Sequence, residues 1–247
     1  MTLKDDFVRS GNWFFRWRSF LPLIFIGIIL IAMREYQYPG RSEAFDHIWE
    51  IVCLFISFIG LTIRILTVGH TPRRTSGRNT KKQIADQLNT TGMYSIVRNP
   101  LYLGNFFMGL GVVLFVHLWW LTLIYILVFW LYYERIIFAE EEFLKRKFGD
   151  KYLNWVQKTP VFFPNFKLYI KPELPFSLRI VLKREYNGFF AVISIMFVLE
   201  IAGEMVIHGK PDFDLGWIIL VSFGFLVWII LRSLKKYTKV LDVKGRK

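Results

Sequence analysis

Two short polar segments of this sequence carry side chains whose types and spacing are suited to binding chemistry. The first is TTGMYSIVRNPLYLGN, at residues 90–105, and its cation is Arg98. The second is AEEEFLKRKFGDKYLNW, at residues 139–155, and it begins with Glu140 and Glu141. A guanidinium group binds carboxylates, and a carboxylate binds ammonium groups, through charge-assisted hydrogen bonds. If the fold brings the two segments together, they can hold a ligand that carries both a carboxylate and an ammonium group.

Asn99 and Pro100 follow Arg98 and favour a helix that begins at this point. Proline suits the first turn of a helix, where its missing N–H is not needed, and the free N–H groups of that turn can bind a carboxylate. Tyr94 and Tyr102 would stand beside this helix start. In an ordinary interpretation, the arginine anchors a lipid phosphate, the tyrosines form an interfacial belt and the glutamates pair with the basic residues that follow them. The spacing of these residues alone does not decide between a ligand site and this ordinary interpretation.

The composition is that of an integral membrane protein. The chain has 247 residues, of which 54% are hydrophobic and 18% aromatic, and a formal net charge of +13, a combination that soluble domains rarely show. The basic residues alternate with long apolar runs, so they favour contact with anionic lipid over contact with nucleic acid. Cys53 is the one cysteine and the four histidines are scattered, so no disulfide, thiolate zinc site or other metal site is predicted.

Six apolar runs predict an all-α polytopic protein with about six transmembrane helices. They lie at about residues 19–34, 47–68, 101–117, 119–133, 186–207 and 214–231, several of them near the ~20 residues that cross a bilayer. Basic residues dominate segment 69–100 and the tail 232–247, so the positive-inside rule puts both termini and the ligand site on the cytoplasmic side of an inner or plasma membrane. The turn between the third and fourth runs is very short. These two runs therefore form an antiparallel hairpin that brings the two polar segments together.

The other parts of the chain are predicted to surround this hairpin. The N-terminus reads as an amphipathic lead-in to a retained helix, and the segment from Ala139 as a helix that lies on the membrane and is interrupted near Gly149. Four prolines after it predict an irregular connector. The chain thus divides into residues 1–84, a lead-in with two transmembrane helices, residues 85–165, the core with the hairpin, and residues 166–247, a connector with two more transmembrane helices.

The two polar segments resemble the motifs of a family of integral membrane methyltransferases that includes isoprenylcysteine carboxyl methyltransferase and phospholipid methyltransferases. The family pattern G-x-Y-x-x-x-R-[HN]-P-x-Y-x-G is matched by Gly92, Tyr94, Arg98, Asn99, Pro100, Tyr102 and Gly104. The pattern E-E-x-x-L-x-x-x-F-G-x-x-Y is matched by Glu140, Glu141, Leu144, Phe148, Gly149 and Tyr152. The resemblance covers roughly residues 85–165, and the rest of the chain matches only in being membrane helices.

The resemblance implies that S-adenosylmethionine (S-adenosyl-L-methionine) binds at the cytoplasmic face. The residues implied to bind this cofactor are Tyr94, Arg98, Asn99, Pro100, Leu101, Tyr102, Gly104, Glu140 and Glu141. The resemblance also implies a lipophilic acceptor that enters from the bilayer. Catalytic roles are implied for Arg98 and for Arg135, which would touch the acceptor.

Asn99 narrows the chemistry, because many members of the family have histidine at this position. Asparagine forms hydrogen bonds but does not titrate, so a histidine base is excluded here. An anionic acceptor needs no base, whereas an amine must first be neutral, and Arg98, Arg135 and the basic segment 73–82 would attract an anion. We therefore favour O-methylation of an anionic lipid or lipidated group, either a phosphate, as in lipid A, or a carboxylate, as in isoprenylcysteine.

Other functions stay open. They are N-methylation of a phospholipid amine, an NADPH-dependent reductase of the membrane sterol type, and a scaffold or transporter without enzymatic activity. A transporter would use Glu200 and Glu204, which are one helical turn apart in an apolar run. In the ordinary interpretation, Glu204 lies with His208 near the outer interface and Glu200 bonds a neighbouring helix. Arg64, at the inner end of the second apolar run, is expected to snorkel to the membrane surface.

Overall fold

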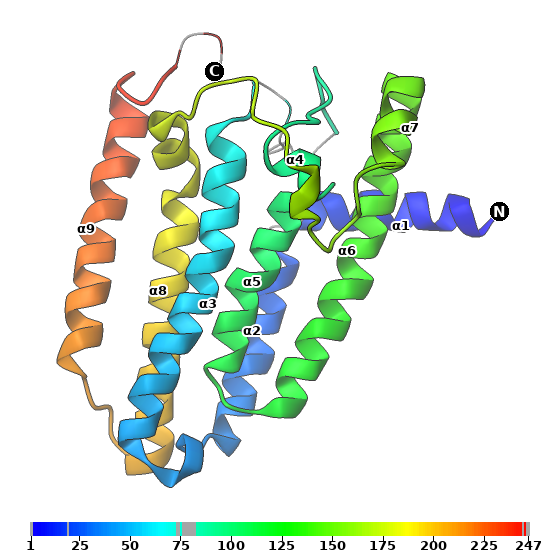
Figure 1. The fold of residues 1–247 in the computed structure, drawn as a ribbon. Coiled ribbons are helices and arrows are strands. Elements are labelled where there is room, and N and C mark those ends of the chain that lie inside the picture. Colours follow the sequence, from blue (N-terminus) through cyan, green and yellow to red (C-terminus); the bar gives the residue numbers. More distant parts are fainter. Residues whose placement is uncertain (1, 19, 73–74, 76–82, 244, 246–247) are drawn as a thin grey trace.

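The protein is a bundle of helices, described by a computed structural model (Figure 1). The structure describes residues 2–18, 20–72, 75, 83–243 and 245, and every regular element among them is a helix. In chain order, the α-helices and the 3-10 helices (η) are α1 (Leu3–Trp17), α2 (Leu21–Ala32), η1 (Met33–Glu35), η2 (Pro39–Arg41), α3 (Glu43–Gly69), α4 (Met93–Ile96), α5 (Pro100–Leu114), α6 (Trp119–Phe148), α7 (Asp150–Val156), η3 (Phe166–Leu168), α8 (Leu178–His208) and α9 (Leu215–Tyr237). The predicted all-α fold is confirmed.

Four helices in the described part of the chain are long and apolar enough to cross a membrane, namely α3, α6, α8 and α9. Helices α2 and α5 are apolar but shorter, with 12 and 15 residues. Together these helices correspond to the six apolar runs of the sequence, and they run in roughly the same direction in Figure 1. The predicted membrane fold is therefore confirmed, whereas six crossings stay a prediction.

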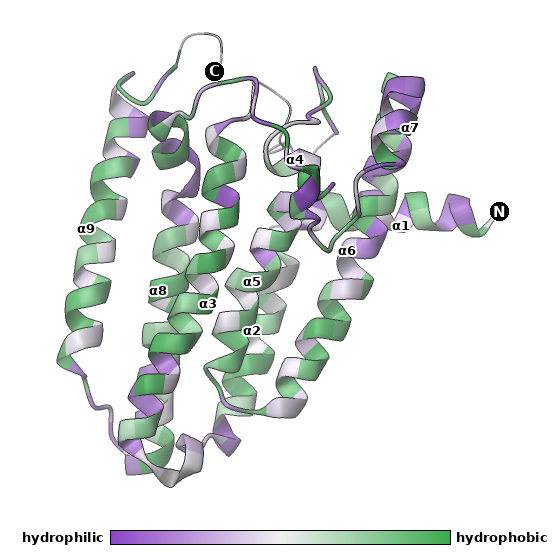
Figure 2. Cartoon of the chain, in the orientation of Figure 1, coloured by the Kyte–Doolittle hydropathy of each residue, from purple (hydrophilic) through white to green (hydrophobic). Residues whose placement is uncertain are grey.

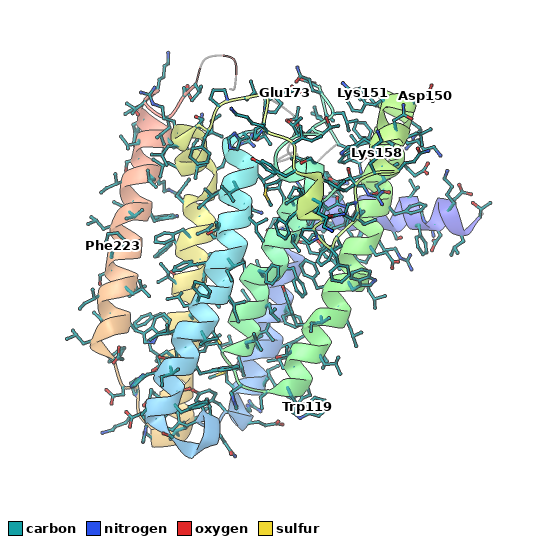
Figure 3. All side chains as sticks on the ribbon, viewed as in Figure 1. Trp119, Asp150, Lys151, Lys158, Glu173 and Phe223 are labelled. Atoms are coloured by element: carbon teal, nitrogen blue, oxygen red, sulfur yellow. The ribbon has the colours of Figure 1, made fainter. Side chains whose placement is uncertain are left out.

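Apolar side chains cover the outside of the bundle. Phe55 of α3, Leu131 of α6 and Phe223 of α9 are 65%, 61% and 57% exposed, and Figure 3 shows Phe223 pointing away from the helices. Figure 2 shows that the middle of the helices is mostly hydrophobic and that hydrophilic residues gather toward their ends. Such a surface suits lipid rather than water, because the helices satisfy their own backbone groups and expose apolar side chains.

Glycines bring α3 and α5 into close contact. A Cβ atom on Gly60 would lie 2.4 Å from the carbonyl oxygen of Gly104, and one on Gly111 would lie 2.3 Å from the carbonyl oxygen of Cys53. Small residues are what allow two helix backbones in a membrane to approach this closely. After α5 the chain turns back through residues 115–118 into α6, which packs against it. The predicted antiparallel hairpin is confirmed.

The acidic segment does not form a separate helix on the membrane. Helix α6 is continuous from its apolar start to Phe148, and α7 follows after Gly149. Residues 134–148 contain no proline or glycine, so nothing ends the helix where the apolar run ends. The predicted surface helix is therefore wrong, whereas the break at Gly149, with φ of 51°, is confirmed. Instead, α1 lies across the bundle and packs against α6 (Figure 1).

The two ends of the bundle differ in character. Helices α4 and α7 lie at one end, which we call the α4–α7 end (Figure 1). Figure 3 shows four charged side chains at this end, those of Asp150, Lys151, Lys158 and Glu173, and Trp119 at the opposite end. The irregular connector from α7 to α8, interrupted by the short η3, crosses the α4–α7 end as predicted from its prolines. That this end faces the cytoplasm stays a prediction.

Candidate functional site

A cavity of about 590 Å³ lies at the α4–α7 end of the bundle. Its walls come from α1, α3, α4, α5, α6, α7 and α8, from Thr75, and from residues 83–85 and 87–89 of the segment before α4. The volume is within the range of small-molecule sites, about 300–1,000 Å³. We call it the motif cavity, because residues of both polar segments of the sequence line it.

The two polar segments meet at the motif cavity. Residues 98–102 line it from the first segment and Glu140 lines it from the second. The Tyr102 hydroxyl donates a hydrogen bond to Glu140 Oε2 at 2.8 Å, and Arg98 Nη1 donates to Glu141 Oε1, also at 2.8 Å. The convergence expected from the hairpin is therefore confirmed, and cation, phenol and carboxylates stand in one network.

The connector between α7 and α8 holds the first polar segment in place. The Arg98 N–H donates to the carbonyl oxygen of Pro160 at 2.8 Å, and Asn99 Nδ2 donates to the carbonyl oxygen of Val161 at 3.1 Å. Helix α5 begins directly afterwards with Pro100 in its first turn, as predicted. The Asn99 side chain is thus an anchor for the connector as well as part of the cavity wall.

One N–H donor of the Arg98 guanidinium has no hydrogen-bond acceptor among the described residues. Its side chain is 16% exposed, and its Nε atom is buried with no hydrogen-bond partner among the described residues. A buried donor without an acceptor is costly, and the polar groups beside this guanidinium are the Glu141 carboxylate and the Tyr152 hydroxyl. Tyr94 lines the same cavity, and burial, reinforced by the Glu140 carboxylate, raises the pKa of its hydroxyl above the usual range. Tyr94 is therefore a neutral hydrogen-bonding group near neutral pH.

Two residues implied to bind the cofactor lie outside the cavity wall. The structure places Gly104 at the contact between α5 and α3, where a Cβ atom would lie 2.5 Å from Arg64 Cγ. Its role in this structure is close helix packing. Glu141 stands behind Arg98 and fixes the guanidinium through their hydrogen bond, so its effect on a ligand would be indirect.

Arg135 points away from the motif cavity and toward α1. Its Nη1 donates to Ser10 Oγ at 3.2 Å, and its guanidinium lies 3.8 Å from the ring centroid of Phe7. Its role as an acceptor contact therefore stays a prediction. Within the basic segment 73–82, the cations lie outside the residues that the structure describes: Arg73, Arg74, Arg78, Lys81 and Lys82.

Arg64 is part of the cavity wall, and the prediction that it snorkels to the membrane surface is wrong. Its Nε and Nη2 donate to the two carboxylate oxygens of Glu185, at 2.7 and 3.0 Å. Its Nη1 donates to Asn105 Oδ1 at 2.6 Å. All three residues line the motif cavity. The sequence contained a signal for this pair, since Glu185 stands at the start of an apolar run, where an unpaired charge is costly.

Comparison with known proteins identifies the segment that forms this site. Residues 77–151 match the model of a family described as phospholipid methyltransferase. This segment, less than a third of the chain, is thus of the phospholipid methyltransferase type. The matched range includes α4, α5 and α6, so the helices that bring the two polar segments together lie in the part that matches the family.

Curated relatives share parts of the chain. A nickel-cobalt-cadmium resistance protein of Alcaligenes xylosoxydans xylosoxydans is 31% identical over 149 residues, 59% of this chain and 64% of that protein. A protein-S-isoprenylcysteine O-methyltransferase of Schizosaccharomyces pombe is 37% identical over 71 residues, 29% of this chain and 30% of that protein. Protein-S-isoprenylcysteine O-methyltransferase B of Arabidopsis thaliana is 28% identical over 145 residues, 53% and 69% of the two chains. The chain thus spans less than two thirds of the first two relatives. No solved structure shows a significant match.

Proposed function

We propose that this protein is a membrane methyltransferase of the phospholipid methyltransferase family and that it transfers a methyl group from S-adenosylmethionine to an anionic group of a lipid or lipidated molecule. The observation that carries the proposal is the motif cavity, which Arg98 and Glu140, from the two polar segments, both line. The two isoprenylcysteine relatives are named O-methyltransferases, which supports transfer to an oxygen.

The residues present fit the amino-acid end of S-adenosylmethionine. Arg98 Nε, which is buried without a partner in the described part of the chain, can donate to its carboxylate, and Glu140 can accept from its ammonium group. Tyr94 and Trp155 add aromatic surface to the same cavity. When bound, the cofactor supplies a methyl group on a positively charged sulfur. The cavity walls would then position the acceptor and exclude water from the site.

The charges of the cavity support an anionic acceptor. Among the described residues that line it there is no histidine or lysine. Its cations are Arg18, Arg64, Arg98 and Arg184, and they outnumber its carboxylates, Glu140 and Glu185. Arginine stays protonated and attracts anions but does not act as a base. A phosphate or carboxylate acceptor needs no deprotonation before it attacks the methyl group, whereas a protonated amine does.

Helix α1 gives the acceptor a wall on one side. Phe15 and Arg18, at the end of this amphipathic helix, line the motif cavity. Arg135 contacts α1 through Ser10 and Phe7, so we propose that Arg135 acts on the acceptor by fixing α1. An anionic headgroup could reach Arg18 while its chains remain in the lipid beside the bundle.

The first experiment is calorimetric binding of S-adenosylmethionine and S-adenosylhomocysteine to the full chain in detergent. Arg98→Ala should remove measurable binding. Arg146→Ala is the matched control and should leave binding unchanged. Arg146 is exposed near the end of α6, and its Nε donates a hydrogen bond to the Glu142 carbonyl oxygen. A wild type that binds neither compound contradicts the proposal, and protection from heat by NADPH would favour the reductase.

The second experiment identifies the atom that receives the methyl group. Wild-type protein, labelled S-adenosylmethionine and extracted membrane lipids are incubated, and the labelled lipid is treated with base. A carboxyl methyl ester releases labelled methanol, and a methylated phosphate keeps its label on a lipid without amine. Label on an amine headgroup would contradict O-methylation while leaving the cofactor site intact.

A further inference from the structure

Three carboxylates are buried together at the end of the bundle opposite the motif cavity. Asp46 and Glu50 come from the start of α3, and Glu200 comes from the second half of α8. They are 3%, 6% and 5% exposed, and one oxygen of each lies within 4.8 Å of the others. We call them the carboxylate cluster. The start of α3 and the end of α8, which carry these residues, lie at the bottom of the bundle in Figure 1.

The N–H and O–H donors nearest to the carboxylate cluster belong to a tyrosine and a tryptophan. The Tyr36 hydroxyl donates to both oxygens of Asp46, each at 2.9 Å, and Trp217 Nε1 donates to Glu50 Oε2 at 3.2 Å. Both donors are neutral. Among the described residues, no lysine or arginine forms an ion pair with any of the three carboxylates.

Glu50 supplies a second and independent observation. Its Oε1 is fully buried, in a residue that is 6% exposed, and receives no hydrogen bond from an N–H or hydroxyl group of the described residues. The Glu200 carboxyl group lies within hydrogen-bonding distance of Glu50, so a proton or a cation is needed between the two carboxylates. A buried carboxylate oxygen is normally satisfied by a donor or by a cation. Glu50 lies one helical turn after Asp46 on α3, so the two carboxylates share one face of this helix.

We propose that the carboxylate cluster binds a divalent cation that prefers oxygen ligands, such as Ca²⁺ or Mn²⁺. One such ion compensates three neighbouring carboxylates at once, and carboxylate oxygens are the ligands that this class of ion prefers. The oxygens lie within 4.8 Å of one another, which is compatible with ligands on opposite sides of an ion at metal–oxygen distances of about 2.3–2.6 Å. The motif cavity lies at the other end of the bundle, so this inference does not depend on the proposed function.

Further titratable groups lie at the same end of the bundle as the cluster. His47 is half exposed, and its Nδ1 lies 3.5 Å from Glu50 Oε2. Glu204 follows Glu200 by one helical turn, accepts a hydrogen bond from the Tyr38 hydroxyl at 2.5 Å and lies 3.6 Å from His208, as the ordinary interpretation of the sequence predicted. Acidic and imidazole groups thus extend from the cluster toward the surface at this end.

The test is direct binding of Mn²⁺, followed by competition with Ca²⁺ and Mg²⁺, to the full chain in detergent after treatment with a chelator. We expect one saturable site in the wild type and an increase in thermal stability when it fills. Glu50→Gln and Glu200→Gln should each weaken binding at least tenfold. Asp212→Asn is the matched control, because Asp212 is an exposed acid between α8 and α9, and it should leave binding unchanged.

Three results would overturn the proposal. They are a wild type with no saturable site for any of the three ions, a Glu50→Gln variant with unchanged affinity, and a stability that depends on pH but on no cation, which would mean that the cluster shares protons instead. If the Gln variants do not fold, quenching of tryptophan fluorescence by Mn²⁺ in the wild type and in Trp217→Phe tests the site instead. Mn²⁺ bound beside Glu50 should quench Trp217, so wild-type quenching that persists unchanged in Trp217→Phe would contradict the site.

Discussion

Glu140→Gln gives the sharpest test of the cofactor site, because it removes one charge and little else. Glu140 lines the motif cavity and accepts a hydrogen bond from the Tyr102 hydroxyl at 2.8 Å. The carboxamide oxygen of glutamine can still accept this bond. The fold and the contact between α5 and α6 should therefore survive, while the attraction for an ammonium group is lost.

The expected effect follows from the kind of bond removed. A hydrogen bond between charged groups contributes about 1.5–3 kcal/mol, and 1.4 kcal/mol corresponds to a tenfold change in affinity. The Kd for S-adenosylmethionine should therefore rise by roughly 10- to 150-fold. S-adenosylhomocysteine should lose the same factor, because it keeps the amino-acid end and lacks only the methyl group.

Glu142→Gln is the control for this measurement. Glu142 carries the same charge on the same helix, but it is not one of the described residues that line the motif cavity. Its carboxylate pairs with the Lys4 ammonium group at 2.9 Å. Its Kd should change by no more than about twofold, since surface ion pairs contribute little. Calorimetry on both variants, with thermal unfolding as a check of the fold, decides the matter. Equal loss in both variants, or no loss in Glu140→Gln, would refute the assignment of Glu140.

Three further predictions concern the frame around the cavity. Gly111→Leu should lower the free energy of unfolding by about 3 kcal/mol, because its Cβ would lie 2.3 Å from the Cys53 carbonyl oxygen; an unchanged melting temperature in detergent would contradict this packing. Arg64→Met alone should destabilise the protein by about 3 kcal/mol because it leaves the buried Glu185 carboxylate unpaired. A double variant that also carries Glu185→Met should recover most of this loss, and chemical unfolding of both variants can measure the recovery. Gly149→Ala should destabilise by about 1–3 kcal/mol, because Gly149 has φ of 51° and ψ of −127°; circular dichroism during heating would show whether it does.

The parts of the site that sequence reasoning found are those fixed by local rules. Pro100 marks the first turn of α5, and the short turn after this helix forces a hairpin, so the convergence of the two polar segments followed from the sequence. The individual pairs, Arg98 with Glu141 and Tyr102 with Glu140, came from the structure. The error over the acidic segment arose from hydropathy. Loss of apolar residues marks where a helix leaves the membrane, but it does not end a helix that lacks a breaker.

The parts that sequence reasoning missed depend on partners distant in the chain. Arg64 taken alone predicts a snorkelling cation, whereas Glu185, 121 residues later, binds it. The position of Arg135 before the acidic pair predicts a contact with the acceptor, which stays a prediction. Its hydrogen bond to Ser10 of the amphipathic helix α1, which packs against α6, could not be foreseen from the sequence. Glu200 could be recognised as an unusual charge, but its neighbours on α3 could not be identified until the packing of α3 against α8 was known.

The same two helices, α3 and α8, meet through polar groups at both ends. Arg64 pairs with Glu185 in the wall of the motif cavity, and Glu50 lies with Glu200 in the carboxylate cluster. At a rise of 1.5 Å per residue, Arg64 and Glu50 are about 20 Å apart along α3. If the two contacts are independent, the losses of stability in Arg64→Met and Glu50→Gln should add to within about 0.5 kcal/mol in the combined variant. A departure of 1 kcal/mol or more would instead mean that α3 and α8 shift as units, and that an ion at one end can alter the shape of the cavity at the other. The same three variants, unfolded with and without Mn²⁺, distinguish these cases.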